Sequence, residues 1–456
     1  MNTTTRTSSP PAFALGSFLK TASFDAFLLL LAGLIIAGIV WIKSRTVSEF
    51  LSDPLLLGYT FFVTLFQISR IVSALLYKHS FKSVTKAKYG ALTGVPYEPM
   101  ITFVIPCMNE EAAIFTTIEK CFQAGYPAHA REVVVINDGS TDNTLSEIMR
   151  AKALYPELIV VNWSVNQGKR HGMAEGFKQA HGDIIIQLDS DSYIEPSTVR
   201  GLVEPFRNPH VGAVSAHTDP LNPDVNLLTK MQTAYYFMSF RILKAAESTF
   251  HTVFCCSGCA SAYRREAVLP ILDVWLTETF WGLPVTWGDD RSITNRVIKQ
   301  GYSTLYTDEA RAYTIVPTNL RQFVKQQLRW KKGWFVNSIF ASKFIIRREP
   351  FVAFTYFFPL MLVTFLTPFM AIRAFIYTPI VHGFEATLYY SLGVLLITLL
   401  IMTVYRFMAP ENRYWPYLFL WSIINMLLLS YLLIIALCTI QNRGWGTRAV
   451  QQHATP

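Results

Sequence analysis

The fold is decided by the stretch Ile184–Asp191 (IIIQLDSD), a short apolar run that ends abruptly in two carboxylates. An apolar run of this length is typical of a buried central strand, and alternate residues of a strand point to the same face. We therefore expect Asp189 and Asp191 to share one face at the carboxyl end of a strand. Open α/β sheets bind their ligands at that end, so the pair is the first candidate for a functional site.

Two carboxylates on one rim repel each other unless a cation neutralises them. A hard divalent ion that also holds a diphosphate supplies that charge, so we predict a Mg²⁺ or Mn²⁺ site at Asp189 and Asp191. The alternative is a turn or a helix cap in which both side chains bond only backbone groups, because Asp-x-Asp is a short pattern. The surrounding motifs favour the metal site.

The composition indicates a membrane protein. Of the 456 residues, 51% are hydrophobic, so the length suggests two to three domains and the apolar excess suggests membrane segments. A Ser/Thr/Pro-rich leader precedes the first apolar run without an obvious cleavage site, so we expect a retained anchor and no signal peptide. Runs long enough to span a bilayer cover 26–42, 55–76, 351–380, 387–408 and 417–440.

The basic residues predict the topology. By the positive-inside rule they place the polar middle of the chain in the cytosol of an integral, multi-pass plasma (inner) membrane protein. Three later crossings would leave Arg443 and Arg448 outside, against that rule, so a broken or re-entrant segment around Pro359 and Pro368 stays open, with five or six crossings in all. The flanking basic residues are Lys78, Lys82, Lys86, Lys88, Lys331, Lys332, Lys343, Arg347 and Arg348.

These observations divide the chain into six parts. Two transmembrane helices precede a cytosolic domain, and an interfacial amphipathic helix and three or four transmembrane helices follow it. The parts are a disordered leader at 1–25, membrane helices at 26–77, the cytosolic domain at 78–318, the interfacial helix at 319–348, membrane helices at 349–441 and a basic tail at 442–456.

Charge and cysteine content limit the partners. The net charge is +9, but the basic residues gather beside membrane segments and no nucleic-acid-binding module is present, so anionic lipid is the simpler partner and no nucleic acid is expected. Cys256 and Cys259 form a Cys-x-x-Cys pattern without a second ligand pair. Free thiols in a reducing cytosol are therefore favoured over a zinc site.

Strands and helices alternate in the first half of the middle domain. Such alternation predicts a mainly parallel sheet with helices on both faces, and it brings Asn109 and Asp138 to the same rim as the Asp189 and Asp191 pair. For Asp138 alone, a turn-forming role is the alternative. The expected strands cover 101–106, 132–136 and 158–161, and the helices extend to Gln123 and over 144–154.

A second acidic pair, Asp289 and Asp290, comes directly before a segment with helical spacing. The dipole at a helix amino terminus favours carboxylates, so this position keeps a base ionised. A capping box at a helix start is the alternative. Two further segments, 227–244 and 320–335, alternate apolar and basic residues as helices lying on a membrane surface do.

The motifs together resemble the nucleotide-sugar-binding half of a family 2 glycosyltransferase. Four of them occur in family order: Pro106 with Asn109 and Glu110, the run 137–142, the run 166–169, and the pair at Asp189 and Asp191. The resemblance implies a GT-A-type fold inserted between transmembrane α-helices, with amphipathic interfacial helices beside it.

The same resemblance assigns roles to residues. It implies that Asp138 reads the uracil, that Asp189 and Asp191 serve UDP and its metal, and that Pro106, Asn109 and Glu110 belong to the nucleotide site. It also places Lys169 and Arg170 near the phosphates, which an ammonium group and a planar guanidinium group can both bind. For either residue, a solvated surface position is the alternative. In the family, Asp290 is the general base, with Asp289 as its acidic partner.

The Gln-x-x-Arg-Trp pattern at Gln326, Arg329 and Trp330 marks processive, membrane-embedded members of the family. Arg329 can bind a diphosphate oxygen, Trp330 offers a flat apolar face to a sugar acceptor, and Gln326 can bond its hydroxyls. The alternative is an amphipathic interfacial helix, and both descriptions can hold at once.

Three kinds of synthase share further patterns with the chain: hyaluronan synthases, chitin synthases and rhizobial chitooligosaccharide synthases. The shared patterns are the triplet 289–291, the run 256–265 and the run 445–448. Cys259 stands where hyaluronan synthases commonly have Pro, and the run 332–334 also differs, which weakens the choice of polymer more than the choice of reaction.

The resemblance implies a processive, inverting β-glycosyltransferase that extends a polysaccharide acceptor and passes it through its own membrane helices. UDP-N-acetylglucosamine is the first choice of donor, alternating with UDP-glucuronate if the product is hyaluronan-like. A nonprocessive, lipid-linked glycosyltransferase is the first alternative, and an inactive membrane transporter or receptor with a degenerate transferase domain is the second. The patterns leave the oligomeric state open.

Overall fold

The computed structural model describes residues 26–27, 30–31, 33–42, 44, 53–85 and 97–441. The expected leader at 1–25, the basic tail at 442–456, and the flanking Lys86 and Lys88 lie outside these described residues.

An eight-stranded sheet forms the centre of the polar domain, with strand order β3-β2-β1-β4-β7-β6-β10-β5. A separate hairpin consists of β8 (Thr279–Phe280) and β9 (Leu283–Pro284). The strands of the sheet are β1 (Ile101–Cys107), β2 (Arg131–Asp138), β3 (Ile159–Trp163), β4 (Ile184–Gln187), β5 (Tyr193–Ile194), β6 (Val211–Pro220), β7 (Ser261–Arg264) and β10 (Ser303–Thr314).

The prediction of a mainly parallel sheet is confirmed, with an antiparallel insertion that the sequence patterns did not reveal. Strands β3, β2, β1 and β4 pair in parallel, and so do β6 and β10. Strand β7 pairs antiparallel with both β4 and β6, and β5 pairs antiparallel with β10. The central position of β4 explains why Ile184, Ile185 and Ile186 are fully buried.

Strand β4 ends at Gln187, before either carboxylate of the IIIQLDSD stretch. The argument that strand alternation puts Asp189 and Asp191 on one face is therefore wrong, because both residues lie in the loop and turn that follow the strand. The backbone N–H of Ser192 closes this turn by donating to the carbonyl of Asp189 (3.0 Å). The pair still lies at the carboxyl end of a central strand, as expected.

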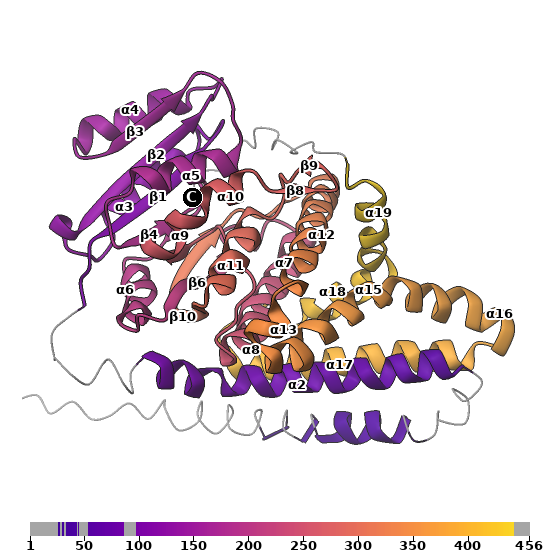
Figure 1. Ribbon diagram of the computed structural model, residues 1–456. Helices are drawn as coiled ribbons and strands as arrows, with labels where there is room; N and C mark the ends of the chain where they lie inside the picture. Colours follow the sequence, from indigo (N-terminus) through magenta and orange to yellow (C-terminus); the bar gives the residue numbers. More distant parts are fainter. Residues whose placement is uncertain are drawn as a thin grey trace, which may run out of the picture.

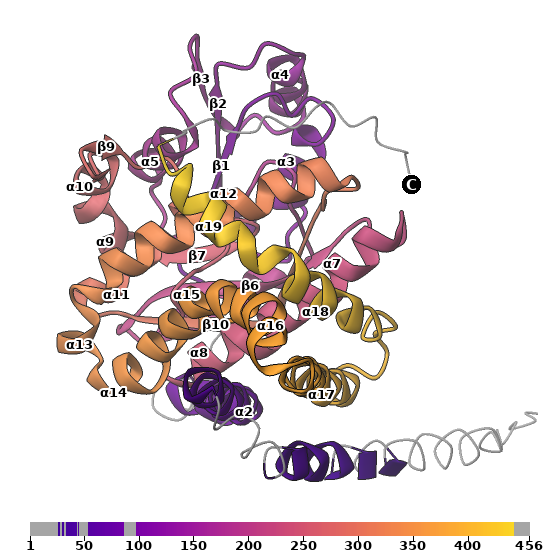
Figure 2. The same cartoon turned by 90° about the vertical axis from the view of Figure 1, so that its right-hand side faces the viewer.

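Helices cover both faces of the parallel half of the sheet, as predicted. In Figure 2 the strands β1 to β3 are seen edge-on, with α5 (Lys169–Gln179) on one side and α3 (Ile114–Phe122) and α4 (Thr144–Leu154) on the other. A glycine allows the close approach of α5, because a Cβ on Gly176 would lie 2.2 Å from Cγ1 of Val104. The position of α5 fixes Lys169 and Arg170 at its amino terminus.

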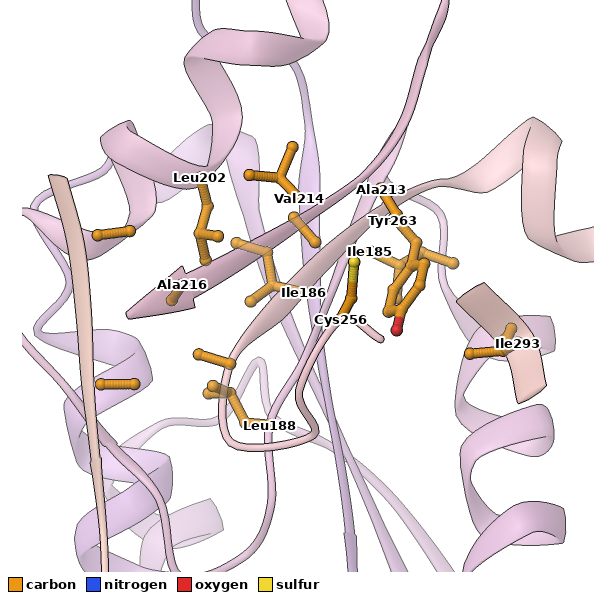
Figure 3. Close-up of a cluster of buried hydrophobic side chains, with 14 of the residues drawn as sticks. Ile185, Ile186, Leu188, Leu202, Ala213, Val214, Ala216, Cys256, Tyr263 and Ile293 are labelled. Carbon is orange, nitrogen blue, oxygen red and sulfur yellow. The ribbon is translucent and has the colours of Figure 1, made fainter. Parts of the chain in front are cut away.

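A continuous apolar core underlies the antiparallel half of the sheet. Figure 3 shows Ile185 and Ile186 of β4 beside Ala213 and Val214 of β6, with Ile293 contributed by a helix. The remaining helical segments of this domain are η1 (Ala128–Ala130), α6 (Thr198–Val203), η2 (Glu204–Arg207), α7 (Leu227–Phe237), η3 (Met238–Lys244), α8 (Ala245–Thr249), α9 (Arg265–Val268), η4 (Leu269–Ile271), α10 (Leu272–Leu276), α11 (Asp289–Gln300), α12 (Leu320–Ser342) and α13 (Ile345–Arg348).

Three helices in the described part of the chain are long and apolar enough to cross a membrane: Pro54–Val84, Pro350–His382 and Glu385–Met408. Helix α2 lies beside α17 at the edge of the molecule (Figure 1). Their elements are α2 (Pro54–Thr85), α14 (Pro350–Val352), η5 (Ala353–Phe357), α15 (Phe358–Ile372), η6 (Arg373–Tyr377), α16 (Thr378–His382) and α17 (Glu385–Met408), and the last apolar helices are α18 (Tyr417–Leu427), η7 (Leu429–Tyr431) and α19 (Leu432–Cys438).

A broken segment exists, but not where the prolines suggested. Pro350–His382 continues as one helix past Pro359 and Pro368, with π-helical turns at η5 and η6. The break lies instead at Leu428, where Tyr417–Leu427 and Leu429–Cys438 meet at 51°. The first apolar run appears in the described residues as a shorter helix, Gly33–Ile42.

The segments expected to lie on a membrane surface are packed into the molecule. Helix α7 contacts α18, and its Met231 and Phe237 share a buried cluster with Tyr405 of α17. Helix α12 packs against α11 on one side and α19 on the other. Part of each apolar face therefore packs against protein, whereas Leu227 and Leu320 are 57% and 58% exposed. The interfacial position of 319–348 stays a prediction.

Candidate active site

Lys169 and Asp189 form an ion pair at the carboxyl ends of the central strands. Lys169 is the first residue of α5 and Asp189 follows β4, and both side chains are about three-quarters buried. Burial lowers the pKa of Lys169, but the carboxylates of Asp189 and Asp290 outweigh burial, so its pKa is raised and it stays charged. Gln187 also donates to Oδ1 of Asp189 from Nε2 (3.3 Å).

Asp290 converges on the same point from the opposite side of the site. A Cβ on Gly258 would lie 2.9 Å from Oδ1 of Asp189 and 2.9 Å from both carboxylate oxygens of Asp290. A side chain at this position would displace at least one of these two carboxylates. The backbone N–H of Gly258 donates to Oδ2 of Asp290 (2.9 Å), and its carbonyl accepts from the backbone N–H of Asp189 (2.9 Å).

The other oxygen of Asp290 is available for chemistry. Its Oδ1 is buried and accepts no hydrogen bond from any described residue. Burial raises the pKa of Asp290 to about 6; Lys169 opposes this shift, while Asp189 and Asp289 add to it. Asp290 is therefore a carboxylate with an unoccupied lone pair and a proton affinity close to neutral pH, as a general base requires.

Asp289 has a different environment from its neighbour. Its Oδ1 accepts from Nε of Arg170 (2.8 Å), and both side chains are 6% exposed. The same guanidinium bonds Glu278 (3.1 Å) and the carbonyl of Trp275 (3.2 Å), and Glu278 in turn contacts Arg296 (3.3 Å). This buried network joins α5, α10 and α11.

The side chain of Arg170 forms buried ion pairs within this network. The sequence predicted a side chain near the nucleotide phosphates, whereas its guanidinium is buried against Asp289 and Glu278. Its Nη2 is buried without a hydrogen-bond partner among the described residues. The structure thus connects Arg170 to the acidic pair.

Asp138 lies at the end of β2, on the predicted rim, and is 3% exposed. Its Oδ1 accepts from the backbone N–H of Gln167 (2.6 Å) and its Oδ2 from that of Gly168 (2.9 Å). Gly168 has a φ of 97°, which favours glycine, and it leads directly into Lys169. Asp138 therefore holds the loop that positions Lys169.

Asn109 joins the first two loops of the rim. It has a φ of 54°, its side-chain oxygen accepts from the backbone N–H of Thr141 (2.8 Å), and its own N–H donates to Ser140 (3.0 Å). The backbone N–H of Glu110 donates to Thr144 (2.8 Å), while Pro106 is buried within β1. The predicted nucleotide residues thus share one connected edge of the sheet.

The predicted acceptor motif lies on α12, at helical spacing along one face. Trp330 is 37% exposed, and its ring lies 6.4 Å from that of Tyr236 on α7. Gln326 has a buried Oε1 without a hydrogen-bond partner among the described residues. Arg329 is half-buried on the same helix.

Two glycines bring α12 against the acidic pair. A Cβ on Gly333 would lie 2.9 Å from Cα and N of Gly288, the residue directly before Asp289. Gly288 itself has a φ of 69°. Lys332 is buried, and its Nζ donates to the carbonyl of Thr439 (2.6 Å) just after α19.

Three residues of this site were not singled out from the sequence as site residues. Gly258 belongs to the run 256–265, but no pattern revealed that two carboxylates meet beside it. Glu278 belongs to none of the motifs, and Tyr236 was treated only as part of an amphipathic helix. Contacts between distant segments, which periodicity does not encode, bring all three into the site.

The donor atoms fit a hard divalent ion. Asp191 is buried and Asp189 half-buried beside Lys169. No group of three or more His, Cys, Asp or Glu side chains within the described ranges could hold a metal alone. An ion bound by these two carboxylates would complete its shell with diphosphate oxygens and water, as Mg²⁺ commonly does.

The fold and the site define the class of the protein, an enzyme that transfers sugars. Residues 99–333, just over half of the chain, match the family model described as "Glycosyltransferase like family 2". The chain belongs to glycosyltransferase family 2, which confirms the resemblance seen in its motifs.

Known relatives agree with this assignment. The chain is similar to the hyaluronan synthase of Streptococcus pyogenes, with 32% identity over 366 residues that cover 79% of this chain and 86% of that protein. It is also similar to an N-acetylglucosaminyltransferase of Rhizobium meliloti (strain 1021), with 30% identity over 77% of this chain and 82% of that protein. A mannosyltransferase from Pyrobaculum calidifontis shares the fold, with a TM-score of 0.57, 20% identity, and coverage of 84% of this chain and 99% of that one.

Proposed function

We propose that the protein is a processive, inverting β-glycosyltransferase. Its donor would be UDP-N-acetylglucosamine, used alone or in alternation with UDP-glucuronate to build a polysaccharide. The observation that carries this proposal is that Asp290 and Asp189, which pairs with Lys169, meet at Gly258. The similarity to a hyaluronan synthase and an N-acetylglucosaminyltransferase supports the choice of donor.

In the proposed reaction Asp290 takes the proton of the acceptor hydroxyl through Oδ1. The acceptor oxygen then attacks the anomeric carbon from the side opposite UDP, so the sugar configuration inverts and UDP leaves. Gly258 holds Oδ2 of Asp290 and thereby fixes which oxygen faces the acceptor. General base catalysis of this kind contributes on the order of a hundred- to ten-thousandfold to the rate.

The donor would bind along the rim of β1, β2 and β4. We propose that Asp138, Pro106, Asn109 and Glu110 form the uridine side, and that Lys169 pairs with the diphosphate.

Asp189 and Asp191 would hold Mg²⁺ or Mn²⁺, which stabilises the charge of the departing diphosphate when bound. The Pyrobaculum mannosyltransferase was solved in complex with GDP-mannose and Mn²⁺.

The acceptor would bind on α12, where Trp330 provides a face for a sugar ring and Arg329 and Gln326 provide polar groups. From there a path of rings continues toward the membrane helices. The ring of Trp330 lies beside that of Tyr236, and the ring of Tyr235, the residue before Tyr236, stacks on Trp421 of α18 at 3.9 Å.

Trp421 also lines a cavity of about 260 Å³ between the membrane helices. We propose that the growing chain leaves through this cavity, which has many polar wall residues for an otherwise apolar region. They are Tyr59, Thr60, Thr64, Gln67, Arg70, Thr367, Tyr389, Tyr390, Thr398, Ser422 and Asn425.

The test is to incubate purified full-length protein with UDP-N-acetylglucosamine, UDP-glucuronate, UDP-glucose or pairs of these donors, and to size the products. A long polymer that contains N-acetylglucosamine supports the proposal. A single sugar added to a lipid would show the nonprocessive alternative, and no transfer from any donor would contradict the proposed reaction.

A further inference from the structure

Arg70 is a basic residue in the middle of the membrane helix α2, and it faces the cavity between the membrane helices. Its side chain is 6% exposed. Thr60, Thr64 and Gln67 precede it at intervals of three or four residues and line the same wall. Helix α2 therefore presents a polar stripe to the cavity that ends in a buried positive charge.

The guanidinium of Arg70 packs against aromatic rings, and the carboxylate of Glu247 beside them accepts a hydrogen bond from the hydroxyl of Tyr356 (3.3 Å). The guanidinium lies 5.2 Å from the ring of Phe66 and 5.8 Å from that of Tyr356. Its Nε is buried without a hydrogen-bond partner, and no described carboxylate forms an ion pair with it. Arg373, at the far end of the membrane helices, differs, because its Nε bonds both oxygens of Asp53 at 2.9 and 2.7 Å.

A buried, unpaired charge opposes folding, and ionisable residues within membrane segments usually serve substrate or ion pathways. The preferred ligand of a guanidinium is a carboxylate or phosphate, which its planar fork can bind through two hydrogen bonds. Gln67 and Asn425 line the same cavity, and neither amide is hydrogen-bonded to another part of the described chain. Amides of this kind suit the hydroxyl and acetamido groups of a sugar.

We propose that Arg70 binds the carboxylates of an acidic polysaccharide as it passes through the cavity, so the product contains a uronic acid. This inference rests on the proposed function and selects the alternating product over a neutral polymer of N-acetylglucosamine. Walls from α2, η3, α15, α17 and α18 surround the site, which favours a carboxylate carried by the chain over the phosphate of a bulk lipid.

The experiment compares wild type, Arg70→Gln and Arg70→Lys as full-length protein in nanodiscs. The matched control is Arg406→Gln, which removes a charge from α17 outside the cavity wall. Two probes are titrated, a tetrasaccharide alternating N-acetylglucosamine and glucuronate, and neutral chitotetraose. Product length and UDP release are measured with UDP-N-acetylglucosamine alone and with UDP-glucuronate added.

Arg70→Gln should weaken binding of the acidic tetrasaccharide about tenfold, the scale of one lost charge-assisted hydrogen bond. The effect should be selective: chitotetraose binding and UDP release from UDP-N-acetylglucosamine alone should fall by clearly less than binding of the acidic tetrasaccharide. The acidic polymer should shorten, and Arg70→Lys should recover part of its length. Arg406→Gln should behave as wild type.

Several results would overturn the proposal. One is equal affinity of wild type and Arg70→Gln for the acidic tetrasaccharide, and another is a wild-type product that never contains uronic acid. A defect that appears only in phosphatidylglycerol nanodiscs, and not in phosphatidylcholine ones, would assign Arg70 to lipid phosphate. In all three cases transfer from UDP-N-acetylglucosamine would persist, so the proposed function would stand; its own failure would appear as no UDP release from any donor.

Discussion

At the residue scale, Asp290 and Asp289 show how two adjacent carboxylates acquire different properties. Asp289 is neutralised by Arg170, whereas Asp290 has a raised pKa and one buried oxygen that accepts no hydrogen bond within the described ranges. A buried network around one carboxylate thus leaves its neighbour free to accept a proton. We expect Asp290 to carry the proton transfer and Asp289 to hold it in position.

The pH dependence of the reaction follows from Asp290. Because its pKa is raised to about 6, kcat/KM should fall as the pH drops below that value, where the base is protonated. Asp290→Asn should lose this acidic limb and reduce transfer by about two to four orders of magnitude, while UDP still binds. The measurements are a pH–rate profile and UDP calorimetry on the same preparation. An equal loss of UDP affinity would instead make Asp290 a binding residue.

The raised pKa of Asp290 also determines how the stability of the fold depends on pH. A carboxyl whose pKa is higher in the folded state favours folding at low pH, and this contribution is lost as the pH rises through about 6. Asp290→Asn should therefore raise the melting temperature at pH 8 but not at pH 4.

Asp191 provides a second test at this scale. Asp191→Asn should abolish metal-dependent binding of UDP, because removing an anionic ligand leaves the diphosphate charge uncompensated. Calorimetry with UDP in the presence and absence of Mn²⁺ measures this effect. Asp273→Asn is the matched control, since that side chain is 90% exposed. Unchanged affinity in Asp191→Asn would exclude the metal assignment.

At the scale of elements, α12 links three parts of the molecule. It carries the acceptor motif, contacts α11 at the acidic pair, and packs on α19 at its other side. The sequence predicted its existence and amphipathic character, because period and motif are local properties. It did not predict which helices pack against this face, because contacts such as the one with α19 join segments that are distant in the sequence.

The contact between α11 and α12 depends on Gly333. A methyl group there would meet the backbone of Gly288, so Gly333→Ala should shift α12 away from Asp290 and lower stability by about 1 to 3 kcal/mol, the usual scale of overpacking. Transfer should fall more than UDP binding does. Gly58→Ala in α2, which meets no atom within 4 Å, is the control. Equal melting temperatures and rates for both variants would contradict the packing argument.

Trp330 tests the acceptor path. Trp330→Ala removes a ring that holds a sugar through its CH face, so the polymer should shorten or disappear while the UDP pocket remains intact. Product length on a gel and UDP release in a coupled assay separate these effects. Tyr417→Ala, which changes a ring of α18 outside the cavity wall, serves as the control. Full-length polymer from Trp330→Ala would show that the acceptor is held elsewhere.

At the scale of the whole molecule, the membrane helices have two distinct ends. At one end Asp53, which precedes α2, pairs with Arg373 before α16. At the other, Lys78 of α2 lies 3.5 Å from Asp308 of β10, which also pairs with Arg241. The catalytic domain therefore attaches to one end of the bundle only (Figure 1).

This arrangement predicts a sidedness. In a Cys438→Ser background, Val165→Cys in the catalytic domain should react with an impermeant maleimide only from the cytosol. Phe384→Cys, in the turn between α16 and α17, should react only from outside. Both native side chains are 70% exposed, so the side of the membrane, and not burial, decides whether each cysteine reacts. Labelling of both from the same side would contradict the cytosolic assignment.

The fold and the reaction class were largely predictable, because strand runs, turn motifs and apolar segments are local features of the sequence. The alternating units up to β4 followed from such patterns, whereas the antiparallel insertion of β7 depends on long-range pairing. The burial of Arg170 against Glu278 was not predictable for the same reason. A basic residue at a helix start has the same local sequence pattern whether it binds phosphate or forms a buried ion pair. The break at Leu428 carries no proline to mark it.

The ion pair between Lys169 and Asp189 implies that the binding of nucleotide and the binding of metal are coupled. In the free protein the ammonium group occupies the carboxylate that a divalent ion would need. A diphosphate that draws Lys169 away frees Asp189, so nucleotide and metal should each raise the affinity for the other by the same factor. The enzyme would then bind neither partner tightly alone, and metal would not accumulate at the site without nucleotide.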